Sequence, residues 1–242
     1  MFCGATNTSM DIVAGRLYPG TNLINNFKTL IEYQNLGLAL FNSFRNAIIL
    51  TALSLLVCSI AGYGFEIYHD KHKDRLMGLL LTAMMIPFAA IMIPLFRMFS
   101  QMKLVDTMIA FMLPSVSTPF LIMLFRQSAR SFPVDLIGAA RMDGLSEISI
   151  FFRIFMPTMK STYAAAMTIT FMNAWNNYLW PKVILQRNDS ITMPMLVANL
   201  LGGYAVDYGM LMLGVFICTI PTAIVFFCLQ KSFAAGIVGS IK

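Results

Sequence analysis

The sequence predicts an all-α fold, a polytopic membrane helix bundle with about five spanning helices. Three observations predict it. Hydrophobic residues make up 58% of the 242 residues, and the mean hydropathy is +0.72. Only 12% of the residues are charged, about half the share found in soluble domains. The apolar residues also gather in stretches of roughly 20 residues, the length that crosses a bilayer, and short polar segments separate these stretches.

Prolines interrupt several of the apolar stretches, including the last one at Pro221. Pro87 and Pro94 interrupt the second apolar stretch, and Pro114 and Pro119 interrupt the third. Proline removes a backbone hydrogen bond from a helix, so both spans are expected to bend. The five spans are expected at 42–65, 76–99, 107–127, 158–180 and 208–231.

Small residues recur four positions apart in the first span, at Ser54, Cys58 and Gly62. This spacing predicts that a neighbouring helix approaches closely, because small side chains let two backbones come together. The last span repeats the spacing at Gly214, Cys218 and Thr222. None of the four cysteines has metal-ligand spacing, so they are interpreted as packing residues.

The N-terminal segment, residues 1–41, is expected to lie outside the membrane. Its apolar stretch Met1–Ala5 is too short for a signal peptide. Residues 23–33 follow several turn-forming residues and are predicted to form a short amphipathic helix.

Basic residues predict the orientation of the spans. They cluster in the 66–75 loop, around the 128–157 segment and at Lys231 and Lys242. Two expected spans separate each of these regions from the next, so all three lie on the same side of the membrane. An excess of Lys and Arg marks the cytoplasmic side. We therefore expect an external N-terminus and a cytoplasmic C-terminus. The predicted organisation is an external segment 1–41, a transmembrane domain 42–232 that includes the cytoplasmic loop 128–157, and a cytoplasmic tail 233–242.

The cytoplasmic stretch 132–157 is predicted to form two short helices separated at Gly144. Glycine readily takes the left-handed conformation that ends a helix, and Ser146 is a suitable N-cap for the next one. Pro157 is expected to end this second helix. Two apolar faces are expected, one with Ile137 and Ala140 and the other with Ile148, Phe151, Phe152 and Phe155. By periodicity alone, the stretch could equally be an amphipathic linker on the membrane surface.

The residue types in this stretch resemble the cytoplasmic loop shared by permease subunits of binding-protein-dependent ABC importers. The matching positions are Gly138-Ala139-Ala140, Gly144, Ile154 and Met156-Pro157. Gly138 stands where the family usually has Glu, and Met156 where it usually has Leu. Asp143 and Phe132-Pro133 resemble the carbohydrate branch, the maltose-type permeases.

The resemblance implies that the 132–157 loop is a coupling helix region that docks on a separate ATPase. It implies four kinds of partner: a second permease subunit in a heterodimer, a cytoplasmic ATPase dimer, an extracytoplasmic solute-binding protein and membrane lipid. ATP and Mg²⁺ would be held by the ATPase, so no cofactor is expected in this chain. The family pattern has six spans, so we expect that a first helix is absent or that the start codon has been assigned late.

The stretch 175–181 is the second informative segment, and the orientation places it at the outer end of the fourth span. Tryptophan and tyrosine favour the membrane interface, so an aromatic belt is one interpretation. The other comes from its resemblance to a carbohydrate-permease pattern, which implies a substrate path or a receptor contact. The residues concerned are Trp175, Asn176, Asn177, Tyr178 and Trp180. By the same resemblance, the 182–208 loop is the expected dock for the solute receptor.

Several function classes are excluded by what the sequence lacks. It has no Gly-rich nucleotide-binding motif, and no catalytic set of residues is evident, so the chain is not expected to be an enzyme. His69 and His72 are better explained as part of a solvated loop than as metal ligands. Acidic residues are almost absent from the middle of the spans. This argues against a proton-coupled transporter, whose proton relay needs ionisable residues inside the membrane. No basic cluster is interleaved with aromatic residues, so no nucleic-acid partner is expected.

Three functions remain. The favoured one is a permease subunit for a sugar or oligosaccharide. The alternatives are an importer permease for a non-sugar solute such as glycerol phosphate, and a non-transporting membrane scaffold.

Overall fold

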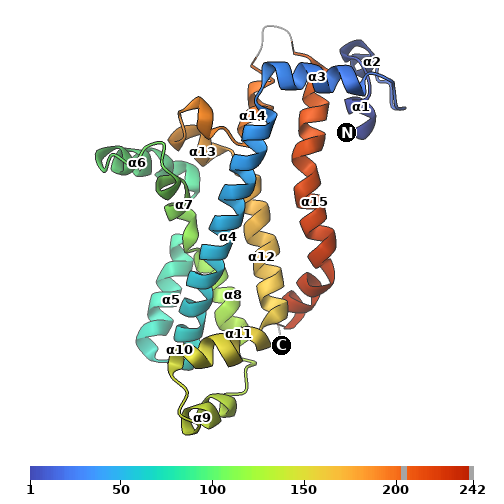
Figure 1. The fold of residues 1–242 in the computed structure, drawn as a ribbon. Coiled ribbons are helices and arrows are strands. Elements are labelled where there is room, and N and C mark those ends of the chain that lie inside the picture. The colour runs from blue at the N-terminus through green and yellow to red at the C-terminus, as the bar shows by residue number, and fades with distance from the viewer. Residues whose placement is uncertain (203–205, 240–242) are drawn as a thin grey trace. The chain divides into compact units, whose positions relative to one another are not determined.

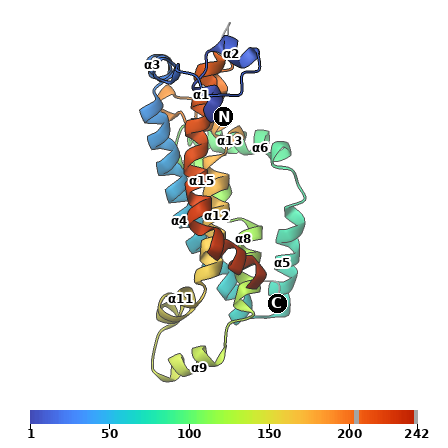
Figure 2. The same cartoon turned by 90° about the vertical axis from the view of Figure 1, so that its right-hand side faces the viewer.

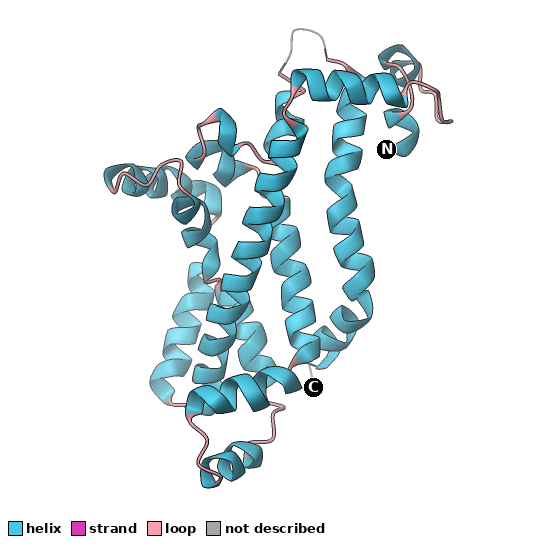
Figure 3. Cartoon of the chain, viewed as in Figure 1, coloured by secondary structure: helices cyan, strands magenta, loops and turns pink. Residues whose placement is uncertain are grey.

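The computed structural model describes residues 1–202 and 206–239, with residues 231–239 described by their backbone alone. Every regular element in these ranges is a helix and none is a strand, which confirms the predicted all-α class (Figure 3). The chain divides into two compact units. Unit 1 comprises Met1–Ile48, Phe99–Phe111 and Met172–Val225, and unit 2 comprises Ile49–Met98, Met112–Phe171 and Phe226–Lys242.

Five helices contribute residues to both units, because the boundary between the units falls inside each of them. They are α4 (Leu36–Ile67), α6 (Phe88–Gln101), α7 (Met108–Val116), α12 (Lys160–Trp175) and α15 (Tyr208–Gly239).

Unit 1 contains the predicted amphipathic helix with the predicted bounds, α3 (Leu23–Tyr33). It lies across the N-terminal ends of α4 and α15 (Figure 1). The shorter elements of this unit are α1 (Phe2–Ala5), α2 (Ser9–Val13), α13 (Leu179–Ile184), the 3₁₀ helix η2 (Asn188–Ser190) and α14 (Met193–Asn199).

A buried amide fixes the N-terminal segment to α3. Asn26 is only 3% exposed, and its Nδ2 donates to the carbonyl oxygens of Ala5 at 2.9 Å and Asn7 at 3.0 Å. Its Oδ1 accepts a hydrogen bond from Nδ2 of Asn22 at 2.8 Å. A buried amide is costly unless its hydrogen bonds are made, and here both of its groups are satisfied. Asn26 of α3 is therefore hydrogen-bonded to the N-terminal segment at Ala5 and Asn7 and to Asn22, directly before its own helix.

Unit 2 contains α5 (Lys71–Ala83) and α8 (Pro119–Ala129), together with the helices of the 132–157 loop. The small residue Gly62 of α4 makes the close helix contact that its spacing predicts. A Cβ at Gly62 would lie 2.6 Å from Cβ of Phe125, 2.8 Å from the nitrogen of Arg126 and 3.0 Å from the oxygen of Ile122. Because these atoms belong to α8, glycine is what lets α4 and α8 approach each other.

In the part of the chain that the structure describes, two single helices are long and apolar enough to cross a membrane, α4 and the Tyr208–Gln230 part of α15. Two bent pairs raise the number to four if each pair is one span: α5 with α6, bent by 99°, and α7 with α8, bent by 45°. Each break comes directly before or at a proline, Pro87 in the first pair and Pro119 in the second. The expected bends in the second and third spans are thus present.

The fourth expected span, 158–180, differs from its prediction. Its helical part is α12, whose 16 residues fall short of the roughly 20 that cross a bilayer. The helix ends at Trp175 and α13 begins at Leu179. The residues between them include Asn176 and Asn177, and asparagine favours turns because its side chain competes for backbone hydrogen bonds.

Candidate functional site

The first helix of the candidate coupling loop is α9 (Asp135–Met142), and it ends as the sequence predicts. Gly144 has a φ of +80°, in the left-handed region. Two hydrogen bonds close the helix end: Gly144 N–H donates to Arg141 at 3.0 Å, and Leu145 N–H donates to Ala140 at 3.0 Å. This is the Schellman arrangement, which satisfies carbonyls at a helix end and turns the chain sharply.

The second helical run joins three elements without a gap. These are α10 (Glu147–Ile150), the π-helix η1 (Phe151–Phe155) and α11 (Met156–Thr158). Ser146 caps α10, with its Oγ accepting a hydrogen bond from Ser149 N–H, as predicted. The run ends at Thr158, one residue beyond Pro157. Pro157 has no N–H for the carbonyl of Arg153, and its ring crowds that carbonyl, so the wider turn immediately precedes it.

The predicted apolar face is wrong in part. Phe151 and Phe155 are buried, but Ile148 is 72% exposed and Phe152 is 45% exposed. Ile150 is buried instead, and Ile154 packs against the same cluster. The face that packs therefore runs through positions 150, 151, 154 and 155, which are neighbours on a helix surface and are turned away from Ile148 and Phe152. The side chains left outside are therefore large and apolar.

Two of the seven candidate coupling residues, Ala140 and Ile154, belong to or pack against a buried cluster. Ala140 is 4% exposed and packs with Phe132, Ile137 and Phe155, and Ile154 packs against the same cluster. The predicted pairing of Ile137 with Ala140 on one face is confirmed, since Ile137 is 1% exposed. The cluster also includes Tyr63 of α4, so the loop is anchored to a long helix of unit 2.

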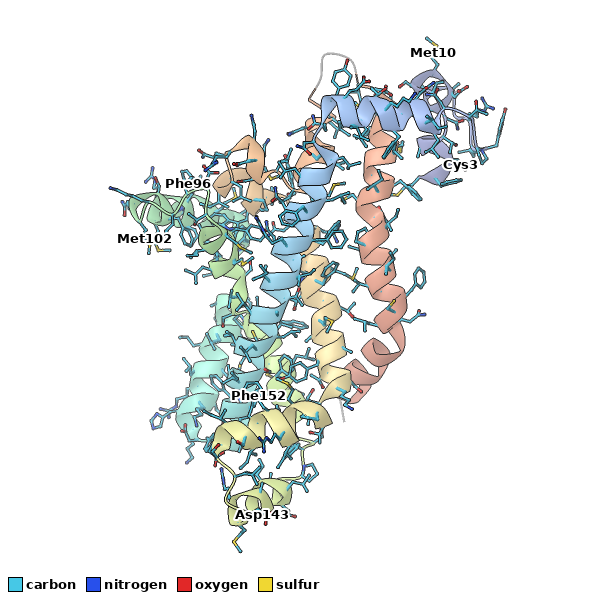
Figure 4. All side chains as sticks on the ribbon, viewed as in Figure 1. Cys3, Met10, Phe96, Met102, Asp143 and Phe152 are labelled. Atoms are coloured by element: carbon cyan, nitrogen blue, oxygen red, sulfur yellow. The ribbon has the colours of Figure 1, made fainter. Side chains whose placement is uncertain are left out.

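The other five candidate coupling residues are exposed at the surface. Gly138, Ala139, Asp143, Gly144 and Pro157 are all exposed. A Cβ added at Gly138 or Gly144 would meet nothing within 4 Å. Figures 1 and 2 both show α9 at the far end of the loop that carries it away from α8. Figure 4 labels Asp143, directly after α9, and Phe152 on the following helical run. The loop thus combines a packed inner side with an open outer side.

A polar triad joins the two short helices to the end of α4. Glu147 accepts hydrogen bonds from Nε of Arg141 at 2.7 Å and from Oη of Tyr68 at 2.5 Å. The hydrogen bond from Arg141, followed by that from Tyr68, lowers the pKa of the Glu147 carboxyl below its ordinary value. The triad therefore fixes the angle between α9 and α10 on the solvent side of the loop.

Replacing Glu147 by glutamine is expected to loosen this angle without unfolding the loop. The groups are solvent-exposed, so the expected effect is small, about two- to fivefold faster amide hydrogen exchange over 135–150. The double exchange of Arg141→Glu with Glu147→Arg is expected to recover part of the protection. Because the pKa of Glu147 is lowered, its contribution is present above the ordinary carboxyl pKa and is lost as pH falls through the lowered value. Unchanged exchange in Glu147→Gln would contradict a role for the triad.

A second charged network was missed at the sequence level. Arg126 of α8 is 3% exposed, donates through Nε to Glu66 at 3.1 Å and pairs through Nη2 with Asp74. His69 also contacts Asp74, at 2.9 Å. The sequence indicated only that Arg126 adds to a cytoplasmic positive charge. Its partners lie 52 and 60 residues away in the chain, so no local pattern could have paired them.

The 175–181 stretch separates into buried and exposed residues. Trp175 and Trp180 are each 1% exposed, and their indole N–H groups donate to the carbonyl oxygens of Cys218 at 2.9 Å and Ala110 at 3.0 Å. Trp175 also packs edge-on against Phe44, and the ring of Trp180 packs at a tilt against Phe99. Both tryptophans therefore hold unit 1 together. Asn176 is exposed, Asn177 is partly buried and Tyr178 lines a cavity.

No group of three or more His, Cys, Asp or Glu side chains that could hold a metal ion occurs among the residues that the structure describes. His69 Nε2 lies 2.9 Å from Oδ2 of Asp74.

Comparison with known proteins decides the family. Residues 56–239 match the family model described as binding-protein-dependent transport system inner membrane component. The chain belongs to this family. It is accordingly a multi-pass inner-membrane permease, as the apolar helices indicate.

The permease is similar over its whole length to a curated relative. It is 45% identical to the lactose transport system permease protein LacG of Rhizobium radiobacter, over 100% of this chain and 89% of the relative. It is 38% identical to the arabinooligosaccharides transport system permease protein AraQ of Halalkalibacterium halodurans, over 93% of this chain and 81% of the relative.

The fold of the permease also matches a solved structure. A bacterial ABC transporter involved in the import of the acidic polysaccharide alginate contains a chain that superposes with a TM-score of 0.82. The match covers 96% of this chain and 88% of that one, at 19% identity, so it bears on the fold alone.

Proposed function

We propose that this permease translocates a sugar or oligosaccharide across the cytoplasmic membrane, driven by a separate ATPase that docks on the 132–157 loop. The permease would work with a second permease subunit and with an extracytoplasmic solute-binding protein. ATP and Mg²⁺ would be bound by the ATPase, and this chain would supply the docking surface and half of the passage.

The two-sided construction of the loop is the observation that carries the proposal. Its inner side is packed into unit 2 through Ala140, Phe151 and Phe155, and these contacts make the loop stiff. Its outer side leaves Ile148, Phe152 and the 90% exposed Met142 uncovered. We infer that these uncovered apolar side chains take part in the contact with the ATPase. A stiff element with an uncovered apolar face is what force transmission from another subunit requires.

The sugar assignment is supported by the relatives. LacG is named for lactose transport and AraQ for arabinooligosaccharides, and both are aligned with more than nine-tenths of this chain. The carbohydrate-type positions Asp143 and Phe132-Pro133 agree with that branch of the family.

The mechanism we infer is an exchange between two states of the bundle. Closure of the ATPase dimer on nucleotide would move the docked loop, and Tyr63 would pass that movement to α4 through the buried cluster. A partner can shift such an equilibrium only by contacting the two states differently. If the loop could deform independently of α4, it would not transmit the movement of the ATPase to the helix bundle.

Uptake assays test the proposal. A deletion strain and a strain complemented with the full chain would be supplied with labelled lactose, an arabino-oligosaccharide and glycerol 3-phosphate. Complementation is expected to restore uptake of at least one saccharide and to leave glycerol 3-phosphate uptake unchanged. Restored uptake of glycerol 3-phosphate alone would contradict the sugar assignment, and no dependence of any uptake on the chain would contradict a transport function.

A further inference from the structure

Unit 1 contains a polar cavity of about 720 Å³ that the sequence did not reveal. Four elements form it: the end of α3, the start of α13, the end of α14 and the start of α15. Its volume lies within the range of small-molecule sites, roughly 300–1,000 Å³. The side chains that matter for its chemistry are Tyr33, Gln34, Tyr178, Lys182, Asn199 and Asp207.

Two aromatic rings and two amides stand among the lining side chains. Tyr33 and Tyr178 each bring a flat apolar ring face with a hydroxyl at its edge, and both are exposed, at 72% and 36%. Gln34 and Asn199 each bring both a donor and an acceptor. The amide oxygen of Asn199 accepts a hydrogen bond from Nζ of Lys182 at 3.3 Å, which holds that amide in place.

The acidic group in the cavity is rigidly held. Oδ1 of Asp207 accepts from Ser9 Oγ at 2.8 Å and from the backbone N–H groups of Gly209 at 2.9 Å and Met210 at 3.1 Å. All three bonds go to the same oxygen, and Oδ2 has no hydrogen-bond partner in the described part of the chain. A fixed carboxylate oxygen without a partner is a strong acceptor for a hydroxyl group.

We propose that this cavity is a saccharide-binding subsite on the outer side of the permease. The inference rests on the proposed sugar transport and names the surface of this chain that the sugar contacts. Sugar rings would lie against Tyr33 and Tyr178, and their hydroxyls would bond with Gln34, Asn199 and Asp207. Of the stretch 175–181, Tyr178 is then the residue that meets the solute, while the two tryptophans support it from the core.

The charge of the cavity favours a neutral sugar over a phosphate ester. Among the residues that line it, Lys182 is the one cation, and it is already bonded to Asn199. Asp207 places a negative charge in the same space. Recognition of a phosphate group generally uses clustered cations or a bidentate arginine, and a carboxylate opposes it.

The test measures ligand binding to the full chain in lipid nanodiscs by saturation-transfer NMR, with lactose, arabinotriose and glycerol 3-phosphate as probes. At least one saccharide is expected to bind. Tyr178→Ala and Gln34→Ala are each expected to weaken that binding fivefold or more. The matched controls are Tyr18→Ala and Gln101→Ala, which change an exposed tyrosine and an exposed glutamine of unit 1 outside the cavity. Both controls are expected to bind as the unchanged chain does.

Three results would overturn the inference: no saccharide binds, the controls lose binding as much as the cavity variants, or glycerol 3-phosphate binds and the saccharides do not. Tyr178-dependent binding of the solute receptor, with no binding of free saccharide, would make this surface a protein contact and would also overturn it. The uptake assay tests the proposed function independently of this binding experiment. If the permease takes up a saccharide but its cavity binds none, the proposed transport function is retained and only the binding subsite is contradicted.

Discussion

Valine in place of Gly144 is expected to abolish uptake while the protein remains in the membrane. Gly144 has a φ of +80°, and a residue with a side chain is strained there by about 1–2 kcal/mol, with β-branched residues fitting worst. The strain can be relieved only if the turn between α9 and α10 changes direction. The relative positions of Asp143 and Ile148 on the outer side of the loop would then change, and the proposed ATPase contact depends on those positions. Transport of labelled sugar into membrane vesicles measures the effect.

Two control variants separate backbone conformation from added bulk. Gly138→Ala also adds a side chain where nothing lies within 4 Å, but Gly138 lies inside α9 with ordinary helical backbone, so uptake is expected to persist. Gly144→Asn is expected to keep part of the activity, because asparagine tolerates the left-handed conformation better than valine. Full uptake by Gly144→Val, with normal amounts in the membrane, would contradict the role of this turn.

Alanine in place of Gly62 is expected to destabilise unit 2. The added Cβ would lie within 3.0 Å of two backbone atoms of α8, the nitrogen of Arg126 and the oxygen of Ile122. Backbone atoms cannot move aside by changing a rotamer, so α4 and α8 must separate. Forcing extra atoms into a packed contact costs typically about 1–3 kcal/mol. Thermal unfolding of the purified protein in detergent measures the loss.

Gly64 supplies the matched control two residues along the same helix. A Cβ there meets nothing within 4 Å, and alanine favours helix over glycine by about 1 kcal/mol. Gly64→Ala is therefore expected to be neutral or slightly stabilising. Equal destabilisation by the two substitutions would mean that the close approach of α4 and α8 does not depend on Gly62.

Local signals in the sequence were sufficient for the features that local chemistry controls. The bounds of α3 follow from its amphipathic pattern, and the end of α9 follows from one glycine. The bends before Phe88 and Pro119 follow from prolines. In each case a few neighbouring residues determine the backbone, so no knowledge of the rest of the fold is needed.

The features that were missed depend on distant partners. Ile148 and Phe152 are exposed because the helical run packs the face with Ile150, Phe151 and Phe155 against the buried cluster that includes Tyr63, and local periodicity does not say which face will pack. The burial of Trp175 and Trp180 depends on carbonyl groups 43 and 70 residues away. The cavity around Tyr178 likewise collects residues from four separate elements.

The central claim is that the loop between α8 and α12 meets an ATPase, and cross-linking tests it most directly. Cysteine would replace Asp143 in a chain without its four native cysteines, and a bifunctional thiol reagent would be added to membranes containing the ATPase subunit. The same reagent would be applied to Met10→Cys, an 85% exposed position in the segment predicted to lie outside. The account predicts a covalent product with the ATPase from position 143 and none from position 10. No product from position 143, or equal products from both, would contradict it.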